Sequence, residues 1–259
     1  MQPSAVPVTR VADDVASDLA SVALVLARRF AAGATMWCVS PSWPAHGRHL
    51  AVEFVHPVIV GKRALPAIHL DGDIVATVRL LARPGDIVAA LGTSDDAAVL
   101  DVLRRCEPWG LTGVWIGAGA RPPAGAADHV LWIDAADAAD AADASDASDA
   151  SDAADAATAM RSGDVVLLYH LLWELTHVVF EHPGLLRAEP ACGDDVCITC
   201  SDEGRVVEVA AAVHGGRVEV LAGGNRETID VSLIEPVVPG DLVLVHAGVA
   251  LTALTRCSP

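Results

Sequence analysis

Residues 83–100 read RPGDIVAALGTSDDAAVL, and this stretch decides the fold of the larger part of the chain. Asp86 to Leu91 is a short apolar run of strand length, and Asp95 to Cys106 shows helical periodicity. Thr93 or Ser94 offers a capping hydroxyl where this helix begins. A buried strand that leads directly into a helix is one unit of an α/β sheet.

The same alternation extends on both sides of this unit. A helix is expected from Val11 to Ala32, with Arg28 and Arg29 placed to suit its dipole. Further strands are expected at 35–39, 66–70, 113–116 and 129–133, and further helices at 46–55, 74–81 and 163–180. Because parallel strands are joined by right-handed crossovers, this order predicts an open, doubly wound parallel sheet covered on both faces.

An Asp-Ala-Ala and Asp-Ala-Ser repeat occupies residues 134–158. Its period of three does not match the α-helical period of 3.6, so no apolar stripe could pack, and like charges three residues apart oppose a helix. The repeat lacks the glycine turn and closing glutamate of an organised calcium loop. We therefore expect a solvated insertion in the α/β domain.

After Pro190 the pattern changes to the alternation of strands. Strand-like segments lie at 206–213, 217–221, 228–233 and 241–246, and glycine-rich turns separate them. This pattern predicts an all-β, antiparallel barrel module. The domain prediction is an α/β domain at 1–187, with its insertion at 134–158, and a barrel at 195–259.

Charge and hydropathy exclude several classes of protein. The formal net charge is −17, and eight of the acids lie in the repeat between Asp134 and Asp155. A chain this acidic lacks the basic patches that phosphate contacts need, so no nucleic-acid binding is expected.

The most apolar stretch, Val165 to Phe180, contains His170, Glu174 and His177, and predicts no membrane span. Without an export signal, the six cysteines are expected as thiols or metal ligands in a cytoplasmic protein.

The stretch 83–100, followed by WGLTGV at 109–114, resembles the phosphosugar-binding SIS domains of the phosphoheptose isomerase and DiaA group. HLAVE at 49–53 and LPAIH at 65–69 resemble further motifs of that group. The resemblance implies a phosphosugar pocket containing Thr93, Ser94, Glu53 and His170, and a domain that forms a homodimer.

Three departures from this group argue against isomerase activity. SPSWPA at 40–45 replaces a glycine-rich turn, and VLLYH at 166–170 replaces a Gln-Glu-x-His motif. Asp95 and Asp96 stand in the phosphate loop, where each carboxylate would repel a phosphate by about 1 kcal/mol. We therefore expect a degenerate domain that binds a ligand or dimerises.

Residues 230–250, DVSLIEPVVPGDLVLVHAGVA, with CITCSD at 197–202, resemble the HypC/HupF hydrogenase-maturation chaperones. The resemblance implies that Cys197 is an iron-ligating thiolate, that Cys200 is an adjunct or alternative, and that His246 is the second ligand. It further implies an iron–cyanide–carbonyl cargo, a larger maturation scaffold and the hydrogenase large subunit as partners. The family's cysteine lies at the start of the protein, whereas these cysteines are internal.

Other interpretations of the cysteines stay open. Cys192, Cys197 and Cys200 have the opening spacing of a plant-type iron–sulfur site, and Cys257 or His214 could complete a zinc site. Exposed thiols beside a strand histidine are a further possibility. We expect a metal-carrying accessory chaperone rather than an enzyme. The alternative is a phosphosugar-binding protein, an isomerase or a sensor, with an accessory metal-binding module.

Overall fold

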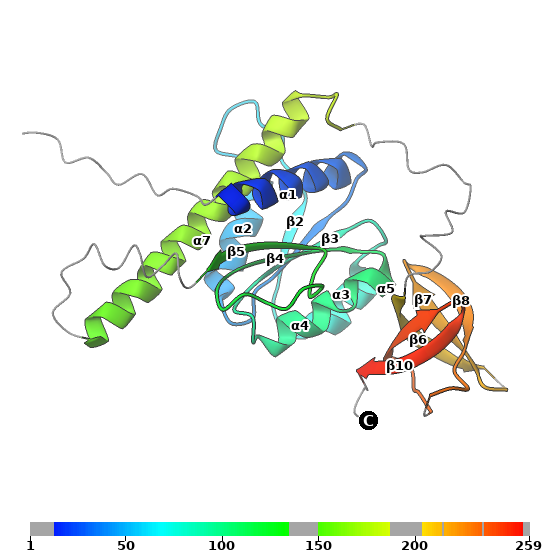
Figure 1. Ribbon diagram of the computed structural model, residues 1–259. Helices are drawn as coiled ribbons and strands as arrows, with labels where there is room; N and C mark the ends of the chain where they lie inside the picture. The colour runs from blue at the N-terminus through cyan, green and yellow to red at the C-terminus, as the bar shows by residue number, and fades with distance from the viewer. Residues whose placement is uncertain (1–12, 135–149, 187–203, 214, 235, 256–259) are drawn as a thin grey trace, which may run out of the picture.

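The computed structural model describes residues 13–134, 150–186, 204–213, 215–234 and 236–255. Two sheets organise these residues (Figure 1): a five-stranded sheet in the first part of the chain and a closed five-stranded barrel in the last part. The predicted fold class, an open α/β sheet followed by a small barrel, is confirmed. The predicted domain boundary near residues 187–195 lies outside the described residues and stays a prediction.

The first sheet is parallel throughout, with the strand order β2-β1-β3-β4-β5. Its inner strands are fully buried because they are almost entirely apolar, as sheets covered on both faces require. The strands are β1 (Met36–Val39), β2 (Ala67–Leu70), β3 (Ile87–Leu91), β4 (Thr112–Gly119) and β5 (His129–Asp134). The strand order reverses between β1 and β3, where open α/β sheets bind their ligands.

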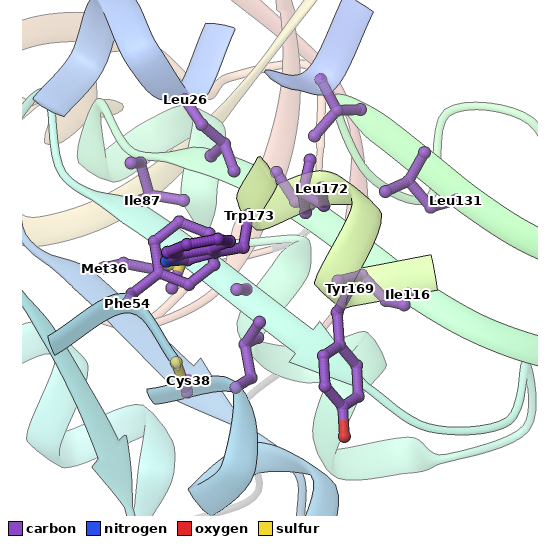
Figure 2. Close-up of a cluster of buried hydrophobic side chains, with 14 of the residues drawn as sticks. Leu26, Met36, Cys38, Phe54, Ile87, Ile116, Leu131, Tyr169, Leu172 and Trp173 are labelled. Atoms are coloured by element: carbon purple, nitrogen blue, oxygen red, sulfur yellow. The ribbon is translucent and has the colours of Figure 1, made fainter. Parts of the chain in front are cut away.

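Helices cover both faces of this sheet. One face packs against α1 (Asp13–Ala31), α2 (Pro44–Val55) and α7 (Ala150–Glu181), whose apolar residues form one core cluster. Figure 2 shows part of this cluster, with Trp173 and Phe54 among the aliphatic side chains and the Tyr169 hydroxyl pointing out of it. The other face packs against α3 (Ile74–Leu81), α4 (Ala97–Leu103) and α5 (Cys106–Trp109).

Helix α7 differs most from the prediction. It begins at Ala150 and not at residue 163, so the last part of the Asp/Ala/Ser repeat is helical and not a loop. The high helix propensity of alanine outweighs the repulsion between aspartates three residues apart. Residues 135–149 of the repeat lie outside the described residues.

The stretch Gly163–Glu181 of α7 is also the candidate membrane span found among the described residues. It has a mean hydropathy of 1.2, and 44% of it is buried inside the protein. A core helix of a globular protein passes the same test, and the apolar face of α7 packs on α1 and the sheet.

The barrel consists of β6 (Arg205–Val213), β7 (Arg217–Ala222), β8 (Asn225–Asp230), β9 (Leu242–His246) and β10 (Val249–Thr255). Its order is β10-β8-β7-β6-β9, and a small apolar core fills it. Strand β10 was not predicted. It pairs antiparallel with β9 and closes the barrel through one parallel pair, Val249 with Asp230. The prediction of a purely antiparallel barrel is therefore wrong at this seam.

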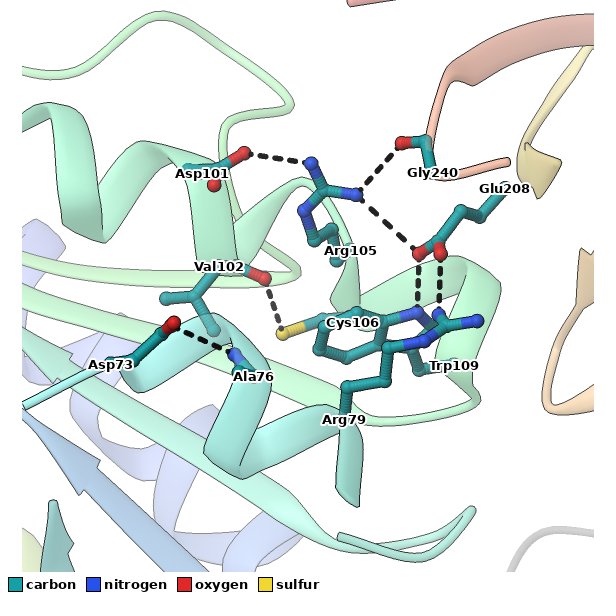
Figure 3. A network of polar contacts seen from close by, with 10 residues as sticks. All are labelled: Asp73, Ala76, Arg79, Asp101, Val102, Arg105, Cys106, Trp109, Glu208 and Gly240. Carbon is teal, nitrogen blue, oxygen red and sulfur yellow. Dashed lines mark hydrogen bonds and ion pairs between the residues drawn. The ribbon is translucent and has the colours of Figure 1, made fainter. Parts of the chain in front are cut away.

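A buried polar network joins the barrel to α3, α4 and α5 (Figure 3). Glu208 on β6 is only 1% exposed, and its carboxylate pairs with the guanidinium groups of Arg79 and Arg105. The indole N–H of Trp109 donates to Glu208 at 2.5 Å, and Arg105 also donates to the carbonyl of Gly240 at 3.1 Å.

The backbones of the two units meet beside this network. The amide of Gly224, in the β7–β8 turn, donates to the carbonyl of Pro108 at 2.9 Å. A Cβ atom at Gly110 would lie 2.8 Å from the carbonyl oxygen of Gly223, so only glycine permits this close approach. The barrel is therefore docked through a specific set of contacts.

Candidate functional site

His246 ends strand β9 and begins the tight turn into β10. His246 pairs with Val249 across a two-residue loop in which Ala247 and Gly248 both have positive φ angles, 49° and 80°. Two consecutive positive φ values are typical of a type I′ hairpin, where asparagine or glycine is the usual first residue. Ala247 thus holds a conformation that alanine rarely adopts, directly beside the predicted ligand. Strained backbone of this kind is concentrated at functional sites.

The start of strand β6 lies beside His246. Arg205 pairs with Val245, the neighbour of His246 on β9. Cys197 and Cys200 lie outside the described residues. Because Cys200 precedes Gly204 by four residues, about 14 Å of extended chain at most separates the two, and about 25 Å separates Cys197 from Gly204. A segment this short limits how far either thiol can lie from the start of β6.

The turn after His246 lies at the other end of β9 from Gly240 and Leu242, although Val206 at the start of β6 also contacts Glu107 of α5. Asp230 pairs with Val249 and with Arg217 near this turn, whereas the Gly223–Gly224 turn and Gly240 lie at the other end. A six-residue strand such as β7 separates the ends by about 17 Å.

A second candidate site joins α2 and α7 on the opposite side of the molecule. His49 Nε2 lies 3.1 Å from Glu53 Oε1 and 3.2 Å from His170 Nε2, and His170 Nε2 lies 3.5 Å from the same carboxylate oxygen. The helical spacing of four residues places His49 and Glu53 on one face of α2. The predicted pair Glu53 and His170 is therefore brought together, and His49 completes it.

Tyr169 and His46 border this cluster. The Tyr169 hydroxyl lies 2.9 Å from His49 Nδ1, and burial together with the Glu53 charge raises the pKa of Tyr169 to about 12. Burial and the neighbouring His49 lower the pKa of His46. The Tyr169 contact engages Nδ1 of His49 and leaves Nε2 facing Glu53 and His170, as a ligating histidine requires.

This cluster has the donor set of a metal site. One ligand atom from each of His49, Glu53 and His170 lies within 4.8 Å of the others. Two imidazoles and one carboxylate suit Zn²⁺ or Fe²⁺. Bound there, such an ion would polarise a substrate oxygen. Without a metal, the same three side chains can hold and move a proton.

The predicted phosphate loop is occupied by its own carboxylate. Asp96, and not Thr93 or Ser94, caps α4, because its side chain accepts from the amides of Ala98 and Val99 at 3.1 and 3.2 Å. The Ser42 hydroxyl donates to the same carboxylate at 2.5 Å, across the end of the sheet between β1 and β3. A bound phosphate would have to displace this carboxylate from the first turn of the helix.

The predicted pocket therefore divides into two parts. Among the described residues, no contact joins Thr93 or Ser94 to Glu53 or His170. Thr93 instead donates to Asp95, and this hydrogen bond lowers the pKa of the Asp95 carboxyl. Of the sequence-predicted residues, Glu53 and His170 are brought together, while Cys197 and Cys200 cannot be placed relative to His246 from the described residues.

Comparison with known proteins assigns the last part of the chain. Residues 203–257, which span the barrel, match the model of the HupF/HypC family. The barrel is therefore a HupF/HypC-family domain, attached here to a separate α/β unit. A comparison with curated proteins found no match to this chain.

Among solved structures, two phosphoheptose isomerases resemble the chain. The enzyme from Francisella tularensis has a TM-score of 0.47 at 14% identity, covering 64% of this chain and 90% of that one. The enzyme GmhA from Neisseria gonorrhoeae has a TM-score of 0.45 at 13% identity, covering 62% and 86%. Likeness at this level carries no conclusion about activity.

Proposed function

We propose that this chain is an accessory protein of nickel–iron hydrogenase maturation that carries an iron–cyanide–carbonyl unit on its barrel. Cys197 supplies the thiolate ligand, with Cys200 as an adjunct, and His246 supplies the second ligand. The match of residues 203–257 to the HupF/HypC family supports a role in hydrogenase maturation. The finer assignment of the cargo and its ligands is our inference.

The observation that carries this proposal is the pairing of Arg205 with Val245. It places the point where the cysteine-containing segment enters the barrel next to the strand end that carries His246. A thiolate and an imidazole supplied by two chain segments would form a site open on its remaining sides, as a carrier needs in order to receive and release its cargo. Thiolate is a soft ligand and imidazole a borderline one, and both suit iron.

The docking of the barrel supports the same assignment. His246 ends β9 at the turn away from Gly240, which bonds to Arg105, and we propose that a maturation scaffold or a hydrogenase large subunit approaches the ligands at this turn. We propose these two proteins as the partners and a homodimer as the state of the α/β domain. The chain then transfers a metal unit without catalysing a reaction of its own.

The test is anaerobic purification after co-expression with hydrogenase-maturation proteins, followed by iron analysis and infrared spectroscopy in the cyanide and carbonyl region. We expect iron with both sets of bands in the wild type and their loss in Cys197→Ala and His246→Ala. Cys106→Ala and His182→Ala are the matched controls, because they remove a thiol and an exposed imidazole in the α/β part.

Three results would redirect the proposal. Bands that persist in Cys197→Ala but vanish in Cys200→Ala would exchange the roles of the two thiols. Zinc or an iron–sulfur cluster in place of the cyanide-bearing iron would select the alternative metal centre. Iron in no sample would refute the carrier function.

The His49–Glu53–His170 cluster favours a second candidate function, a phosphosugar-binding enzyme or sensor. Glu53 would take a proton from a sugar carbon and His170 would return one to the neighbouring position, with or without a divalent metal. Calorimetric titration with sugar phosphates and with Zn²⁺ tests this function. Sugar-phosphate binding that is lost in Glu53→Gln and in Ser94→Ala would support this second function. Binding that is indifferent to both changes would exclude this pocket.

A further inference from the structure

A third group of polar side chains lies at the carboxyl ends of β1 and β2, apart from both sites described above. Ser40 directly follows β1, and its Oγ lies 3.1 Å from Nε2 of His69 on β2. The other ring nitrogen of His69, Nδ1, lies 3.6 Å from a carboxylate oxygen of Asp71. The order hydroxyl, imidazole, carboxylate is that of a nucleophilic triad.

The parallel pairing of the two strands produces this order. Cys38 pairs with His69 and Val39 with Leu70, so the residues that follow, Ser40 and Asp71, leave the sheet side by side. Helix α2 crosses over them at Gly47. A Cβ atom there would lie 1.9 Å from Ser40 Oγ and 2.7 Å from Cδ2 of His69, so the pair fits only beneath a glycine.

We propose that Ser40, His69 and Asp71 form a nucleophilic site that hydrolyses small activated acyl esters. Ser40 Oγ attacks the acyl carbon while its proton passes to His69 Nε2, and the imidazolium then protonates the departing alkoxide or phenolate. Water next attacks the acyl-serine and gives a proton to His69 Nε2. The bond from the acyl carbon to Ser40 Oγ then breaks, the carboxylic acid leaves, and His69 returns its proton to Ser40 Oγ. Both steps balance with water as the only co-reactant.

The exposure of Ser40, His69 and Asp71 determines which substrates fit and how reactive the serine is. Ser40 is 1% exposed beneath α2, so an ester reaches its hydroxyl only when the N-terminal part of α2 moves aside, and a small acyl group such as acetyl needs the smallest movement. The side chain of His69 is 9% exposed, and burial lowers its pKa against the opposing effect of Asp71. The lowered pKa favours the neutral ring near pH 7, and the neutral ring is the form that can accept a proton from Ser40. Asp71 is 69% exposed and shared with Arg48, so it orients His69 only weakly.

The experiment is a stopped-flow assay of the full chain with p-nitrophenyl acetate, followed by acid quenching and peptide mapping of the acetylated residue. We expect a burst of nitrophenol with acetylation at Ser40 and a weaker response to the hexanoate ester. Ser40→Ala should abolish the burst, His69→Gln should slow it by about 100-fold or more, and Asp71→Asn by only about fivefold. Ser42→Ala is the matched control, because that hydroxyl bonds to Asp96 and not to a histidine.

A second variant keeps the test valid if Ser40→Ala or His69→Gln fails to fold. In Ser40→Cys, the new thiol lies beside His69 and should react with iodoacetamide at least about tenfold faster than Cys38 of the same molecule. Cys38 is buried two residues earlier, and burial raises the pKa of its thiol. Acetylation elsewhere than Ser40, a burst unchanged in folded His69→Gln, or a Ser40→Cys thiol no faster than Cys38 would each overturn the proposal.

Discussion

Replacing Glu208 by glutamine should loosen the barrel from the α/β part without unfolding either. Glu208 is 1% exposed, and its carboxylate is shared by Arg79, Arg105 and the Trp109 indole. The amide of glutamine keeps the size of the side chain and can still accept from the indole. It removes the charge that compensates the buried guanidinium of Arg105.

The free-energy cost of Glu208→Gln depends on the contacts that Arg105 and Arg79 keep after the charge is lost. Breaking a buried ion pair costs about 3–5 kcal/mol when one charge is left alone. The side chain of Arg105 is 8% exposed but keeps the carbonyl of Gly240 and the carboxylate of Asp101, both at 3.1 Å. The Arg79 side chain is 41% exposed and recovers solvation. We therefore expect a cost below that range, about 2–3 kcal/mol.

Amide exchange at Gly224 is the assay, because this amide donates to the carbonyl of Pro108 across the interface and is freed when the barrel undocks. A cost of about 2–3 kcal/mol corresponds to exchange faster by about 30- to 150-fold. Glu219→Gln is the control. Its carboxylate bonds to Arg226 at 3.1 Å on the barrel surface, where the loss is worth about 1 kcal/mol or less.

A double-mutant cycle identifies the partner that matters. Glu208→Gln combined with Arg105→Gln should show a coupling energy above about 1 kcal/mol, whereas the combination with Arg79→Gln should show less, because Arg79 is partly solvated. If Glu208→Gln accelerates exchange at Gly224 no more than Glu219→Gln does, the network does not hold the barrel and the reasoning is refuted.

Three further predictions concern single sites. Ala247→Gly should raise the stability of the barrel by about 1 kcal/mol in thermal unfolding, because glycine adopts the positive φ of 49° without strain; an unchanged or lower melting temperature would contradict this. Asp96→Ala should cost about 1 kcal/mol as a lost helix cap, measured by urea unfolding, and should improve phosphate binding in calorimetry if the carboxylate blocks that loop. Burial lowers the pKa values of His46 and His69 below the usual histidine value, so the unfolded chain binds these protons more readily, and the free energy of unfolding should fall as the pH drops through about 6.5. His46→Gln should reduce that slope in denaturation curves recorded from pH 7.5 to 5, and an unaltered slope would assign it to other groups.

The sequence predicted the elements whose signal is local and missed the contacts that depend on distant residues. The strand and helix order of the parallel sheet follows from short apolar runs that alternate with helical periodicity. The cap of α4 was assigned to Thr93 or Ser94, but Asp96 in the same TSDD run reaches the free amides, and a carboxylate is as good a cap as a hydroxyl. Strand β10 shows the alternation of a strand in VALTALT, so its presence also follows from a local signal.

The candidate site was harder to predict for the same reason. His49 and Glu53 are four residues apart on a predicted helix, so their proximity could be read from the sequence. His170 joins them from a helix about 120 residues further along, and nothing local indicates that contact. Glu208 looks like an ordinary strand residue in RVVEVAAAV, and only the docked α/β part makes it a buried charge.

The His49–Glu53–His170 cluster and the barrel that carries His246 lie on opposite faces of the parallel sheet, and this separation limits how the two can cooperate. The His49–Glu53–His170 cluster belongs to the layer of α2 and α7, whereas the barrel docks on the layer of α3, α4 and α5 (Figure 1). The sheet and both of its helix layers therefore lie between the cluster and the barrel. This arrangement argues against direct transfer of a metal ion from the cluster to His246. The α/β part can instead serve the barrel by fixing which end faces a partner, and the Glu208 network is the device that fixes it. If the proposed function holds, a variant that undocks the barrel should impair delivery to the proposed partner and leave the proposed iron binding at Cys197 and His246 intact. That result would separate a positioning role of the α/β part from a role in loading.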